Sequence, residues 1–460
     1  MEPSDEATGL PGDDTIAAII TPPGAGGIAA VRIAGRRSRS ILERLFQPKS
    51  NQETRPFLMR CGQLVSGLGE PIDEVLAVWM PLGQSYTGLE QVELFCHGGR
   101  QVVRRVLDEI LVCGARAAEP GEFTRIAFLN GRIDLARAEA VAEVIAADTD
   151  LSYRVSREHL LGAYSNQIEN LRYSLIAILA DLEASIDFTE EEIESDERAA
   201  QIERLENIAR ELGELISTYR GGEIIREGFK LAIGGRPNAG KSSLFNLLLK
   251  RERALVNPKA GTTRDYLSEW IDIEGLAVNL IDTAGIRRGG GEIEKLGQQS
   301  ARKLLADADL ILWMVDLSSN SWKRNLKAEL RSLGDKPNIL LGNKIDIVEK
   351  HDRDERINLE ISCKTGRGFK QLHEMLHERI AETLPDLTSG LVVTSARHES
   401  KLKACLDQVQ TAKALIDAEE SPELPALELR LGIQALEEIT GRIYNEEVLG
   451  AIFSRFCIGK

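Results

Sequence analysis

The feature that constrains this chain most is the segment FKLAIGGRPNAGKSSLFNLLL, which runs from Phe229 to Leu249. It spells a short apolar strand, a glycine-rich turn and a helix, and the turn has the pattern G-x-x-x-x-G-K-S from Gly235 to Ser242. Backbone N–H groups of such a turn converge on a phosphate at the positive end of the following helix. We expect Lys241 to reach the β- and γ-phosphates and the Ser242 hydroxyl to ligate magnesium. The segment therefore predicts a nucleoside triphosphate site.

Three further motifs follow in the order that a Ras-like domain requires. DTAG, from Asp282 to Gly285, closes an apolar strand; the aspartate would hold magnesium through water, and the glycine N–H would sense the γ-phosphate. In NKID, residues 343–346, Asp346 can accept hydrogen bonds from guanine N1–H and the 2-amino group, which adenine lacks. SCK, residues 362–364, completes a base pocket. Together the motifs predict a Ras-like P-loop GTPase domain over residues 228–384.

The predicted nucleotide contacts from these motifs are Asn238, Ala239, Gly240, Lys241, Ser242, Ser243, Asp282, Thr283, Ala284, Gly285, Asn343, Lys344, Asp346, Ser362, Cys363 and Lys364. Lys241 is also counted as catalytic. How water is activated is less evident, because the residue after DTAG, where Ras carries its water-orienting glutamine, is Ile286. Arg264, Arg287 and Arg288 lie in the predicted switch regions. The sequence leaves open whether one of them is an arginine finger or all are solvated surface side chains.

In GRPNAGKSS, in NPKAGTTRD at residues 257–265 and in DTAGIR, the chain resembles the tRNA modification GTPase family, often called MnmE or TrmE. The resemblance implies activation by potassium as two G domains pair. The K⁺ ligands that it implies are Asn238, with backbone groups at Asn257, Lys259 and Thr262. It further implies that Thr263 joins Ser242 on Mg²⁺ and that Glu294 orients the attacking water. The nucleotide contacts that it adds are Asn257, Pro258, Lys259, Ala260, Gly261, Thr262 and Thr263.

A competing motif is H-E-x-x-H at residues 373–377, which is also the spelling of a zinc protease. Phe369, Leu372, Leu376 and Ile380 supply one apolar face at helical spacing around it. Since no third ligand is evident, we interpret the segment as an ordinary amphipathic helix of the GTPase domain.

Long helices are predicted on both sides of the GTPase. Residues 136–219 have helical periodicity, abundant Leu, Ala and Glu, and no proline, and the same character returns in residues 398–416 and 427–443. We therefore expect one helical domain, residues 134–227 and 385–460, split by insertion of the GTPase. Gly221, Gly222 and the region of Pro385 are candidate hinges.

The first part of the chain, residues 1–133, has short β-rich runs broken by Gly and Pro, which predicts an α+β module. Its GAGG segment, residues 24–27, lacks the G-x-G-x-x-G spacing and is better explained as a tight turn than as a phosphate loop. TPPGAGGIAAVRI, YTGLEQVELFCHGG and PGEFTRIAFLNGRIDLARAEA resemble the same family, so the resemblance covers essentially the whole chain. It implies a constitutive dimer and a 5-formyl- or methylene-tetrahydrofolate site. The folate contacts implied are Arg32, Glu93, Arg132, which stands where lysine is common, and Lys460.

The closing residues FCIGK resemble the family's C-terminal signature, which would return to the N-terminal domain beside the folate. Cys457 could be a nucleophile there or a small buried residue, and from the residues alone burial is the better interpretation. The alternative for the whole tail is a structural plug built on Phe453, Phe456 and Ile458.

Composition limits the possible partners and location. Six cysteines without paired short spacing indicate reduced thiols rather than a disulfide framework. The net charge of −15 would repel a phosphate backbone, so a nucleic acid would have to meet a local basic patch or a second protein. No apolar run long enough for a membrane span and no targeting segment is present, which favours a soluble cytoplasmic protein.

The function expected from the resemblance is a K⁺-stimulated GTPase that forms a heterotetramer with a flavin-dependent partner subunit. It would place an aminomethyl or carboxymethylaminomethyl group on the wobble uridine of certain tRNAs, with the carbon supplied by tetrahydrofolate. The alternative is a ribosome-assembly or signalling GTPase whose helices only bind a partner and which transfers no group.

Overall fold

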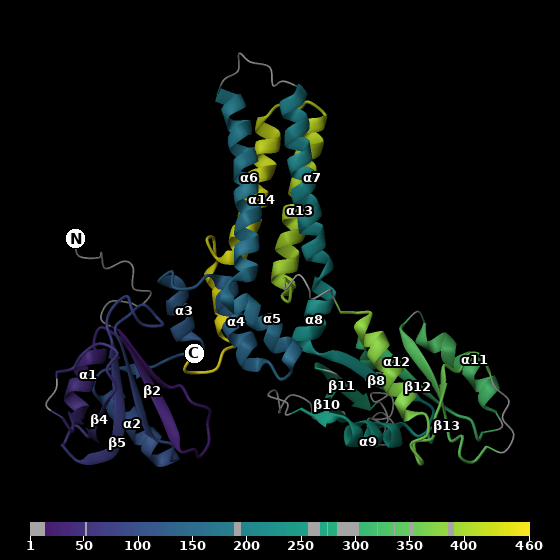
Figure 1. Ribbon diagram of the computed structural model, residues 1–460, viewed down its shortest axis with the longest axis horizontal. Helices are drawn as coiled ribbons and strands as arrows, with labels where there is room; N and C mark the ends of the chain where they lie inside the picture. Colours follow the sequence, from purple (N-terminus) through teal and green to yellow (C-terminus); the bar gives the residue numbers. More distant parts are fainter. Residues whose placement is uncertain are drawn as a thin grey trace, which may run out of the picture. The chain divides into compact units, whose positions relative to one another are not determined.

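The computed structural model describes residues 14–50, 53–187, 195–255, 267–273, 275–282, 303–319, 321–334, 336–348, 354–384 and 391–460 (Figure 1). The chain divides into two compact units. Unit 1 comprises Met1–Ala142, Leu160–Arg172 and Gln434–Lys460, and unit 2 comprises Glu143–His159 and Tyr173–Ile433. Each unit contains one seven-stranded sheet together with helices. The expected combination of an α+β module, long helices and an inserted GTPase domain is confirmed.

Unit 1 is built on a mostly antiparallel sheet with the strand order β3-β4-β5-β6-β2-β1-β7. Its strands are β1 (Thr15–Ile19), β2 (Ile28–Gly35), β3 (Phe46–Pro48), β4 (Arg60–Val65), β5 (Pro71–Met80), β6 (Gln91–His97) and β7 (Arg116–Ala117). Its first helices are α1 (Ser38–Leu45), α2 (Arg100–Val112) and α3 (Glu122–Leu129). The GAGG segment lies in the loop between β1 and β2, where the Gly26 amide donates to the carbonyl of Gly98 at 3.3 Å.

Alternating side chains give this sheet two packed faces. Val31 and Ile33 of β2 share a buried cluster with residues of α1 and α2. On the other face Ile16, Ala18 and Ala34 pack with Phe123 of α3. Because successive side chains of a strand point to opposite faces, Arg32 lies on the α3 side, between Val31 and Ile33. This alternation sets the position of the second site described below.

The last residues of the chain pack onto this N-terminal module. Helix α15 (Glu446–Phe453) contacts α3, and Phe453 and Phe456 are buried beside Phe128. The tail then forms an isolated bridge between Ile458 and Pro120. A Cβ on Gly459 would lie 2.4 Å from the carbonyl oxygen of Ile19, so only glycine allows this close approach. The expected return of the tail to the N-terminal domain is confirmed.

Unit 2 contains the second sheet, in the order β14-β13-β12-β8-β11-β10-β9, in which β10 runs antiparallel to both of its neighbours, β9 and β11, and the other pairs are parallel. Its strands are β8 (Phe229–Gly235), β9 (Arg253–Ala254), β10 (Leu267–Ile273), β11 (Leu276–Asp282), β12 (Leu310–Asp316), β13 (Asn338–Asn343) and β14 (Leu359–Glu360). Helices α9 (Lys241–Arg251) and α12 (Phe369–Ala381) pack on one face, and α11 (Trp322–Leu333) packs on the other. Parallel strands covered on both faces are expected to be almost continuously apolar, as LILWMV of β12 is.

Helix α12 carries the H-E-x-x-H motif, and its four apolar residues Phe369, Leu372, Leu376 and Ile380 are all buried against the sheet. His373 instead lies 3.6 Å from a carboxylate oxygen of Glu252. The interpretation of this segment as an amphipathic helix of the GTPase domain is confirmed.

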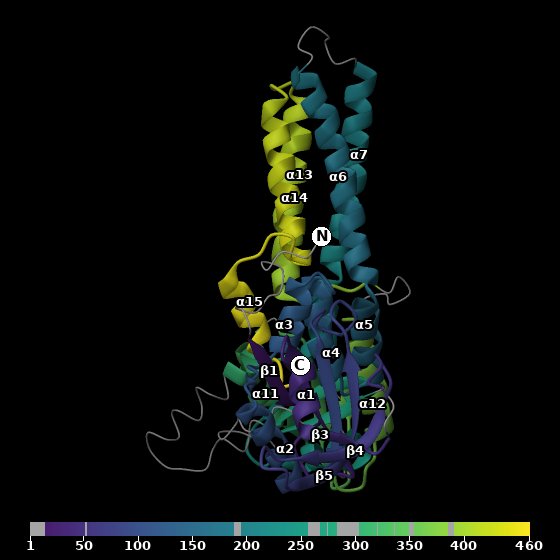
Figure 2. The same cartoon turned by 90° about the vertical axis from the view of Figure 1, so that its left-hand side faces the viewer.

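The remaining helices are α4 (Leu135–Ala146), α5 (Asp150–Leu161), α6 (Ala163–Asp187), α7 (Ser195–Ser217), α8 (Tyr219–Glu227), α13 (Ala396–Asp417) and α14 (Glu423–Thr440). Figures 1 and 2 show α6, α7, α13 and α14 running side by side. Leu205 and Leu212 of α7 and Leu402 and Val409 of α13 are fully buried, which is the apolar face that their periodicity predicts. Within the described residues, no helix is both long and apolar enough to cross a membrane.

The two glycines expected to form a hinge lie inside α8, and both are buried. A Cβ on Gly222 would lie 2.1 Å from the carbonyl oxygen of Val393, so this glycine permits the helix to pack tightly against the chain that returns from the GTPase. The hinge prediction is therefore wrong at this position, because close helix packing accounts for the glycine. The Pro385 region lies outside the described residues.

Candidate functional site

The phosphate loop joins β8 to α9 and has the backbone that its sequence requires. Asn238 and Gly240 have φ angles of 64° and 104°, in the left-handed region. A Cβ on Gly240 would lie 2.2 Å from the side-chain nitrogen of Asn343, so this position excludes larger residues. The Lys241 ammonium donates to the carbonyl oxygen of Arg236 at 2.8 Å, which holds the lysine across the loop. The loop thus presents backbone N–H groups and one cation at the N-terminus of α9.

Ser242 and Asp282 meet beside this loop. The Ser242 hydroxyl donates to Asp282 Oδ2 at 2.9 Å, and Asp282 is 1% exposed at the end of β11. A serine hydroxyl and a carboxylate are hard oxygen ligands of the kind that Mg²⁺ prefers. The pair therefore fits a magnesium ion bound through Ser242, with Asp282 holding its water. When bound there, magnesium would neutralise charge on the β- and γ-phosphate oxygens.

Asn343 connects three of the four sequence motifs. It lies at the end of β13 and is 3% exposed, its amide donates to the carbonyl oxygen of Ala239 at 2.8 Å, and its own oxygen accepts from the Cys363 amide at 3.1 Å. Both partners are backbone groups, so the asparagine fixes the base loops against the phosphate loop. Burial raises the pKa of the Cys363 thiol to about 11, which keeps it protonated beside the base site.

Asp346 is oriented by the neighbouring motif. The Ser362 hydroxyl donates to Asp346 Oδ1 at 2.7 Å, and this hydrogen bond holds the pKa of Asp346 below its ordinary value of 3.8. The carboxylate is therefore ionised at neutral pH and can accept from two guanine N–H groups. With Lys344 and Lys364, it lines a cavity of about 790 Å³ that extends to Asn238 and Ser242. Ala239 is buried below this cavity, and Ser243 also lines it.

Asp316 was not anticipated as part of the site. It ends β12 at the same edge of the parallel sheet as Asp282 and Asn343, and Lys344 Nζ donates to its Oδ2 at 2.6 Å. Burial alone would raise the pKa of Asp316, but hydrogen bonds from Lys344 and Ser318 outweigh it and lower the pKa. An acidic residue directly after the strand LILWMV was the signal that could have identified it.

The other predicted nucleotide, metal and catalytic residues lie outside the described residues. They are Asn257, Pro258, Lys259, Ala260, Gly261, Thr262, Thr263, Thr283, Ala284, Gly285 and Glu294, together with the three switch arginines Arg264, Arg287 and Arg288. Their roles stay predictions.

A second polar cluster lies in the N-terminal module of unit 1. Arg32 of β2 and Glu93 of β6 are direct cross-strand partners, and Arg32 Nε donates to Glu93 Oε1 at 2.9 Å. Their side chains are only 14% and 15% exposed. The guanidinium carbon of Arg32 lies 5.4 Å from the ring centroids of both Tyr86 and Phe123. A semi-buried ion pair bordered by aromatic rings is a suitable surface for a flat, polar heterocycle.

Gln91 and Phe123 extend this cluster. Gln91 is 1% exposed and donates to Glu93 Oε1 at 3.1 Å. The Phe123 amide donates to the main-chain oxygen of Lys460 at 3.2 Å, which brings the tail to the same aromatic residue. Sequence reasoning missed both, although residues 91 and 93 share one face of β6 by alternation.

Arg132 and Cys457 differ from this group. Arg132 Nη1 donates to the carbonyl oxygen of Gly83, and its stem lies 3.5 Å from a Cβ placed at Gly88, so it packs on the loop that carries Tyr86. Within the part of the chain that the structure describes, Arg132 forms no hydrogen bond or ion pair with Arg32 or Glu93. Cys457 is exposed, so the expectation that it is a buried residue is wrong. All six cysteines are free thiols, as expected.

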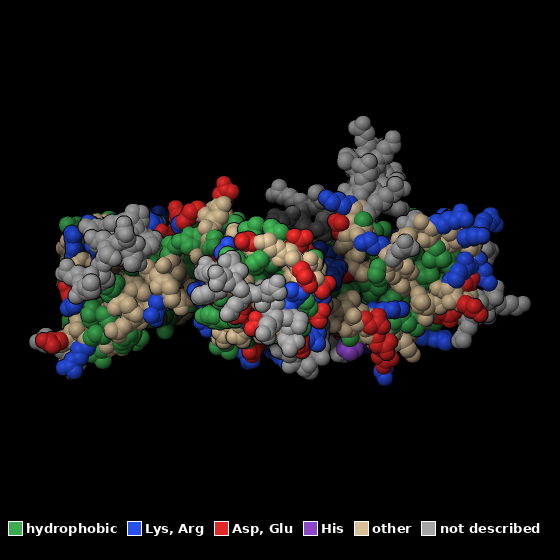
Figure 3. All heavy atoms as spheres, turned by 90° about the horizontal axis from the view of Figure 1, so that it is seen from above, with side chains coloured by type: hydrophobic (Ala, Val, Ile, Leu, Met, Phe, Trp, Pro, Cys, Tyr) green, Lys and Arg blue, Asp and Glu red, His purple; other side chains and the backbone are tan. Residues whose placement is uncertain are grey.

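The chain also carries a local basic patch, the feature that a nucleic-acid partner of so acidic a protein would need. Figure 3 shows Lys and Arg side chains gathered over α11. Arg324, Lys327 and Arg331 are exposed and lie at helical spacing on one face of it.

The fold and the first site define a P-loop GTPase, because a phosphate loop, a Ser242–Asp282 pair suited to magnesium and an aspartate suited to a guanine base meet at one edge of a parallel sheet. Two family models match the chain: GTP-binding protein TrmE N-terminus over residues 15–132 and the MnmE helical domain over residues 135–457. The chain belongs to the MnmE family of tRNA modification GTPases.

Curated relatives match along almost the whole chain. The tRNA modification GTPase MnmE of Akkermansia muciniphila is 42% identical over 97% of this chain and 99% of its own length. The protein of the same name from Aquifex aeolicus is 39% identical over 97% of this chain and 100% of its own length. Among solved structures, the G domain of the T. maritima FeoB iron transporter is 30% identical and covers 34% of this chain and 98% of that one, with a TM-score of 0.26. The relatives identify this chain as a GTP hydrolase that takes part in tRNA modification, rather than an assembly or signalling GTPase.

Proposed function

We propose that this protein is a K⁺-stimulated GTPase that acts with a flavin-dependent partner subunit on the wobble uridine of certain tRNAs. The product carries an aminomethyl or carboxymethylaminomethyl group, and its carbon comes from 5-formyl- or methylene-tetrahydrofolate. The protein acts in the cytoplasm as a homodimer within a heterotetramer. Its functional segments are residues 1–133 for folate and dimerisation, 134–227 and 385–460 for the helical domain, and 228–384 for the GTPase.

The observation that carries the folate part is the cluster of Arg32, Glu93, Tyr86 and Phe123. A pterin ring is flat and has adjacent N–H donors, which a carboxylate such as Glu93 accepts, while aromatic rings border its faces. Arg32 orients the Glu93 side chain and leaves further guanidinium N–H groups for a carbonyl oxygen of the ligand. Arg132 and Lys460 are assigned to the outer part of the site, where the glutamate tail of a folate carries negative charge.

The potassium part of the proposal rests on Asn238 and on Ile286, the residue that follows DTAG. Asn238 lines the nucleotide cavity from a left-handed backbone position. Its side-chain carbonyl is a suitable K⁺ ligand, with backbone groups at Asn257, Lys259 and Thr262 completing the set. Bound potassium would supply positive charge near the transferred phosphate, as an arginine does in other GTPases. Thr263 joins Ser242 on magnesium, and Glu294 orients the water that Ile286 cannot orient.

Folate binding is tested by titrating the purified protein with 5-formyltetrahydrofolate in a calorimeter. Glu93→Gln keeps the shape of the side chain but replaces one acceptor oxygen with a donor, so we expect affinity to fall about 10- to 100-fold. Glu74→Gln is a matched control, because Glu74 is an exposed glutamate of the same sheet. Equal folate affinity of the wild-type and Glu93→Gln proteins would exclude the cluster as the site.

A further inference from the structure

The segment of residues 391–395 brings the chain from the GTPase back to α13, and residues 392–395 are buried although the segment forms neither helix nor strand. Val392 and Val393 are 0% exposed, and Thr394 and Ser395 are 5% and 7% exposed. Irregular backbone normally runs on the surface, since its polar groups need partners. The partners of this segment therefore indicate what holds it in the interior.

Helix α8, which leads into the GTPase, supplies the first of these partners. The Val393 amide donates to the Thr218 hydroxyl oxygen at 3.0 Å, and Arg226 Nη1 donates to the carbonyl oxygen of Thr394 at 3.5 Å. Gly222 lets the helix approach the carbonyl of Val393. The two places where the chain enters and leaves the GTPase are thus packed directly against each other.

These two segments, α8 at the entry and residues 391–395 at the exit, are called the crossings. Both crossings contribute side chains to the core of the GTPase. Ile224 and Ile225 of α8 and Val392 share one buried cluster with Phe229 and Leu231 of the central strand β8. Because packed cores transmit displacement rather than absorb it, a movement of the sheet would carry α8 and the returning segment with it.

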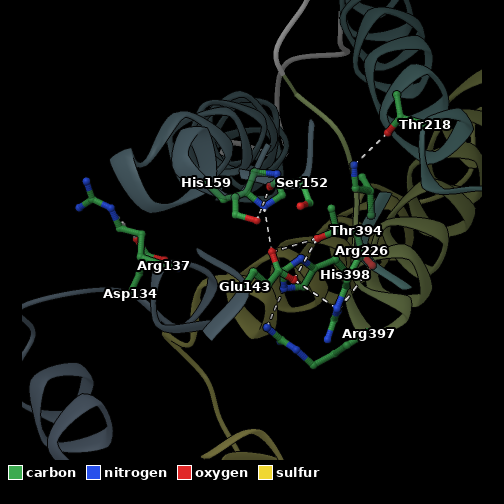
Figure 4. A network of polar contacts seen from close by, with 12 residues as sticks. Asp134, Arg137, Glu143, Ser152, His159, Thr218, Arg226, Thr394, Arg397 and His398 are labelled. Carbon is green, nitrogen blue, oxygen red and sulfur yellow. Dashed lines mark hydrogen bonds and ion pairs between the residues drawn. The ribbon is translucent and has the colours of Figure 1, made fainter. Parts of the chain in front are cut away.

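A carboxylate from a different helix joins the two crossings (Figure 4). Glu143, near the end of α4, accepts from the Thr394 hydroxyl, with its two oxygens at 3.3 and 3.5 Å, and lies 3.4 Å from Arg226 Nε. His159 Nδ1 of α5 lies 3.8 Å from the same carboxylate. The Glu143 side chain is 12% exposed, so its charge depends on these partners.

We propose that Glu143 is a positioning residue that latches the GTPase to α4, and that release of this latch couples the GTP cycle to tRNA modification. Thr394 and Arg226 lie on the two segments that contribute Val392, Ile224 and Ile225 to the GTPase core, whereas α4, which carries Glu143, contributes no residue to that described cluster. If the GTPase moved only part of the way from α4, the buried Glu143 carboxylate would lose Thr394 and Arg226 without gaining water, which would raise the free energy. The latch therefore favours two arrangements, engaged and released, over a continuous range.

The first test is hydrogen exchange of the full chain carrying Glu143→Gln, which preserves shape but removes the charge that Arg226 and Thr394 bind. We expect exchange of the Val393 amide to rise by about tenfold or more, as for loss of a charge-assisted hydrogen bond. Exchange in α9, inside the GTPase core, should not change, and GTP affinity should stay within about twofold, because no nucleotide-site residue belongs to the latch. The number of tRNAs modified per GTP hydrolysed should fall.

Thr394 provides an independent variant. Thr394→Val removes the donating hydroxyl and should reproduce both the faster Val393 exchange and the loss of coupling. Thr394→Ser keeps the hydroxyl and should retain coupling. The double variant Thr394→Val with Glu143→Gln should lose no more coupling than either single variant. The control is Glu183→Gln, since Glu183 forms an ion pair with Arg430 at 2.7 Å in the helical bundle, away from both crossings. Unchanged Val393 exchange, or an equal rise throughout the chain, would overturn the latch. So would a normal ratio of tRNA modified to GTP hydrolysed in a variant whose segment exchanges faster. Failure of the wild-type protein to bind folate would count against the proposed folate chemistry and not against the latch, because the hydrogen-exchange test does not depend on folate.

Discussion

The main-chain oxygen of Lys460 accepts a hydrogen bond from the Phe123 amide at 3.2 Å, in the first turn of α3. The ring of Phe123 lies beneath the Arg32 guanidinium, so the tail and the semi-buried ion pair share one aromatic residue. The Cys457 carbonyl oxygen likewise accepts from the Gly121 amide at 3.4 Å. The tail thus supplies acceptors to amides at the N-terminus of this helix, which helix geometry leaves without intrahelical partners.

Removal of residues 457–460 should abolish folate binding and tRNA modification while GTP turnover in K⁺ stays near normal. The nucleotide site lies on the other sheet, and Phe453 and Phe456, which are buried, remain in the truncated chain. Calorimetry with folate, GTP turnover and thermal unfolding of one truncated protein check this.

If the tail were a structural plug, the truncation would lower the melting temperature and impair both activities together. Of the three residues of that alternative, Phe453 and Phe456 are buried, as a plug requires, whereas Ile458 is 62% exposed. Unchanged folate affinity in a stably folded truncation would remove Lys460 from the site.

Asn238→Ala should remove the stimulation of GTP hydrolysis by K⁺. Nucleotide affinity should stay within about twofold, because the phosphates are held by backbone N–H groups and Lys241. Turnover is compared in KCl and NaCl at equal ionic strength, with Ser243→Ala, in the first turn of α9, as a control from the same cavity. Full K⁺ stimulation in Asn238→Ala would exclude this residue as a ligand.

Asp346→Asn should weaken GTP binding by about 100-fold or more, since two hydrogen bonds to a charged acceptor are lost. The asparagine amide can donate to the 2-oxo group of xanthosine triphosphate, where guanine has a donor instead. Competition binding between the two nucleotides measures the change. An unaltered preference for GTP would mean that Asp346 does not bind the base.

Asp316→Asn should flatten the acid dependence of GTPase-domain stability. The pKa of Asp316 is lowered below 3.8 in the folded state, so the unfolded chain binds the proton more tightly. The stabilising contribution of Asp316 is present above pH 3.8, the ordinary pKa of the side chain. It is lost as the pH falls through the lower pKa of the folded state. Denaturant midpoints between pH 7 and about pH 3 should therefore converge for the wild-type and variant proteins at the acid end.

Much of the nucleotide site could be predicted because its motifs are local. Ser242, Asp282 and Asn343 each occupy a strand or helix end, and parallel strands bring such ends to one edge. Asp316 was overlooked because a lone aspartate has no motif around it. The two hydrogen bonds through which Asn343 joins three motifs could not be predicted, since both involve backbone groups distant in sequence.

The N-terminal cluster was harder to predict because its members come from separate strands and loops. Arg32 and Glu93 were named through the family resemblance, but their pairing depends on the register of β2 against β6. Nothing local indicates that Phe123 and Tyr86 lie beside them. Gly221 and Gly222 misled for the opposite reason: local propensity suggests a break, whereas both are buried inside α8 and Gly222 packs tightly against Val393.

The tail contacts described for unit 1 also affect how the chain is synthesised. Arg125 of α3 pairs with Glu446, 321 positions later in the sequence. At ordinary translation speeds of about 5–20 residues per second, roughly 15 to 65 s pass between the synthesis of these two partners. During that interval α3 has emerged from the ribosome without the residues that satisfy its first amides. Phe128 of α3 likewise waits for Phe453 and Phe456 to bury it, so this module completes its packing only after the C-terminal segment has been made.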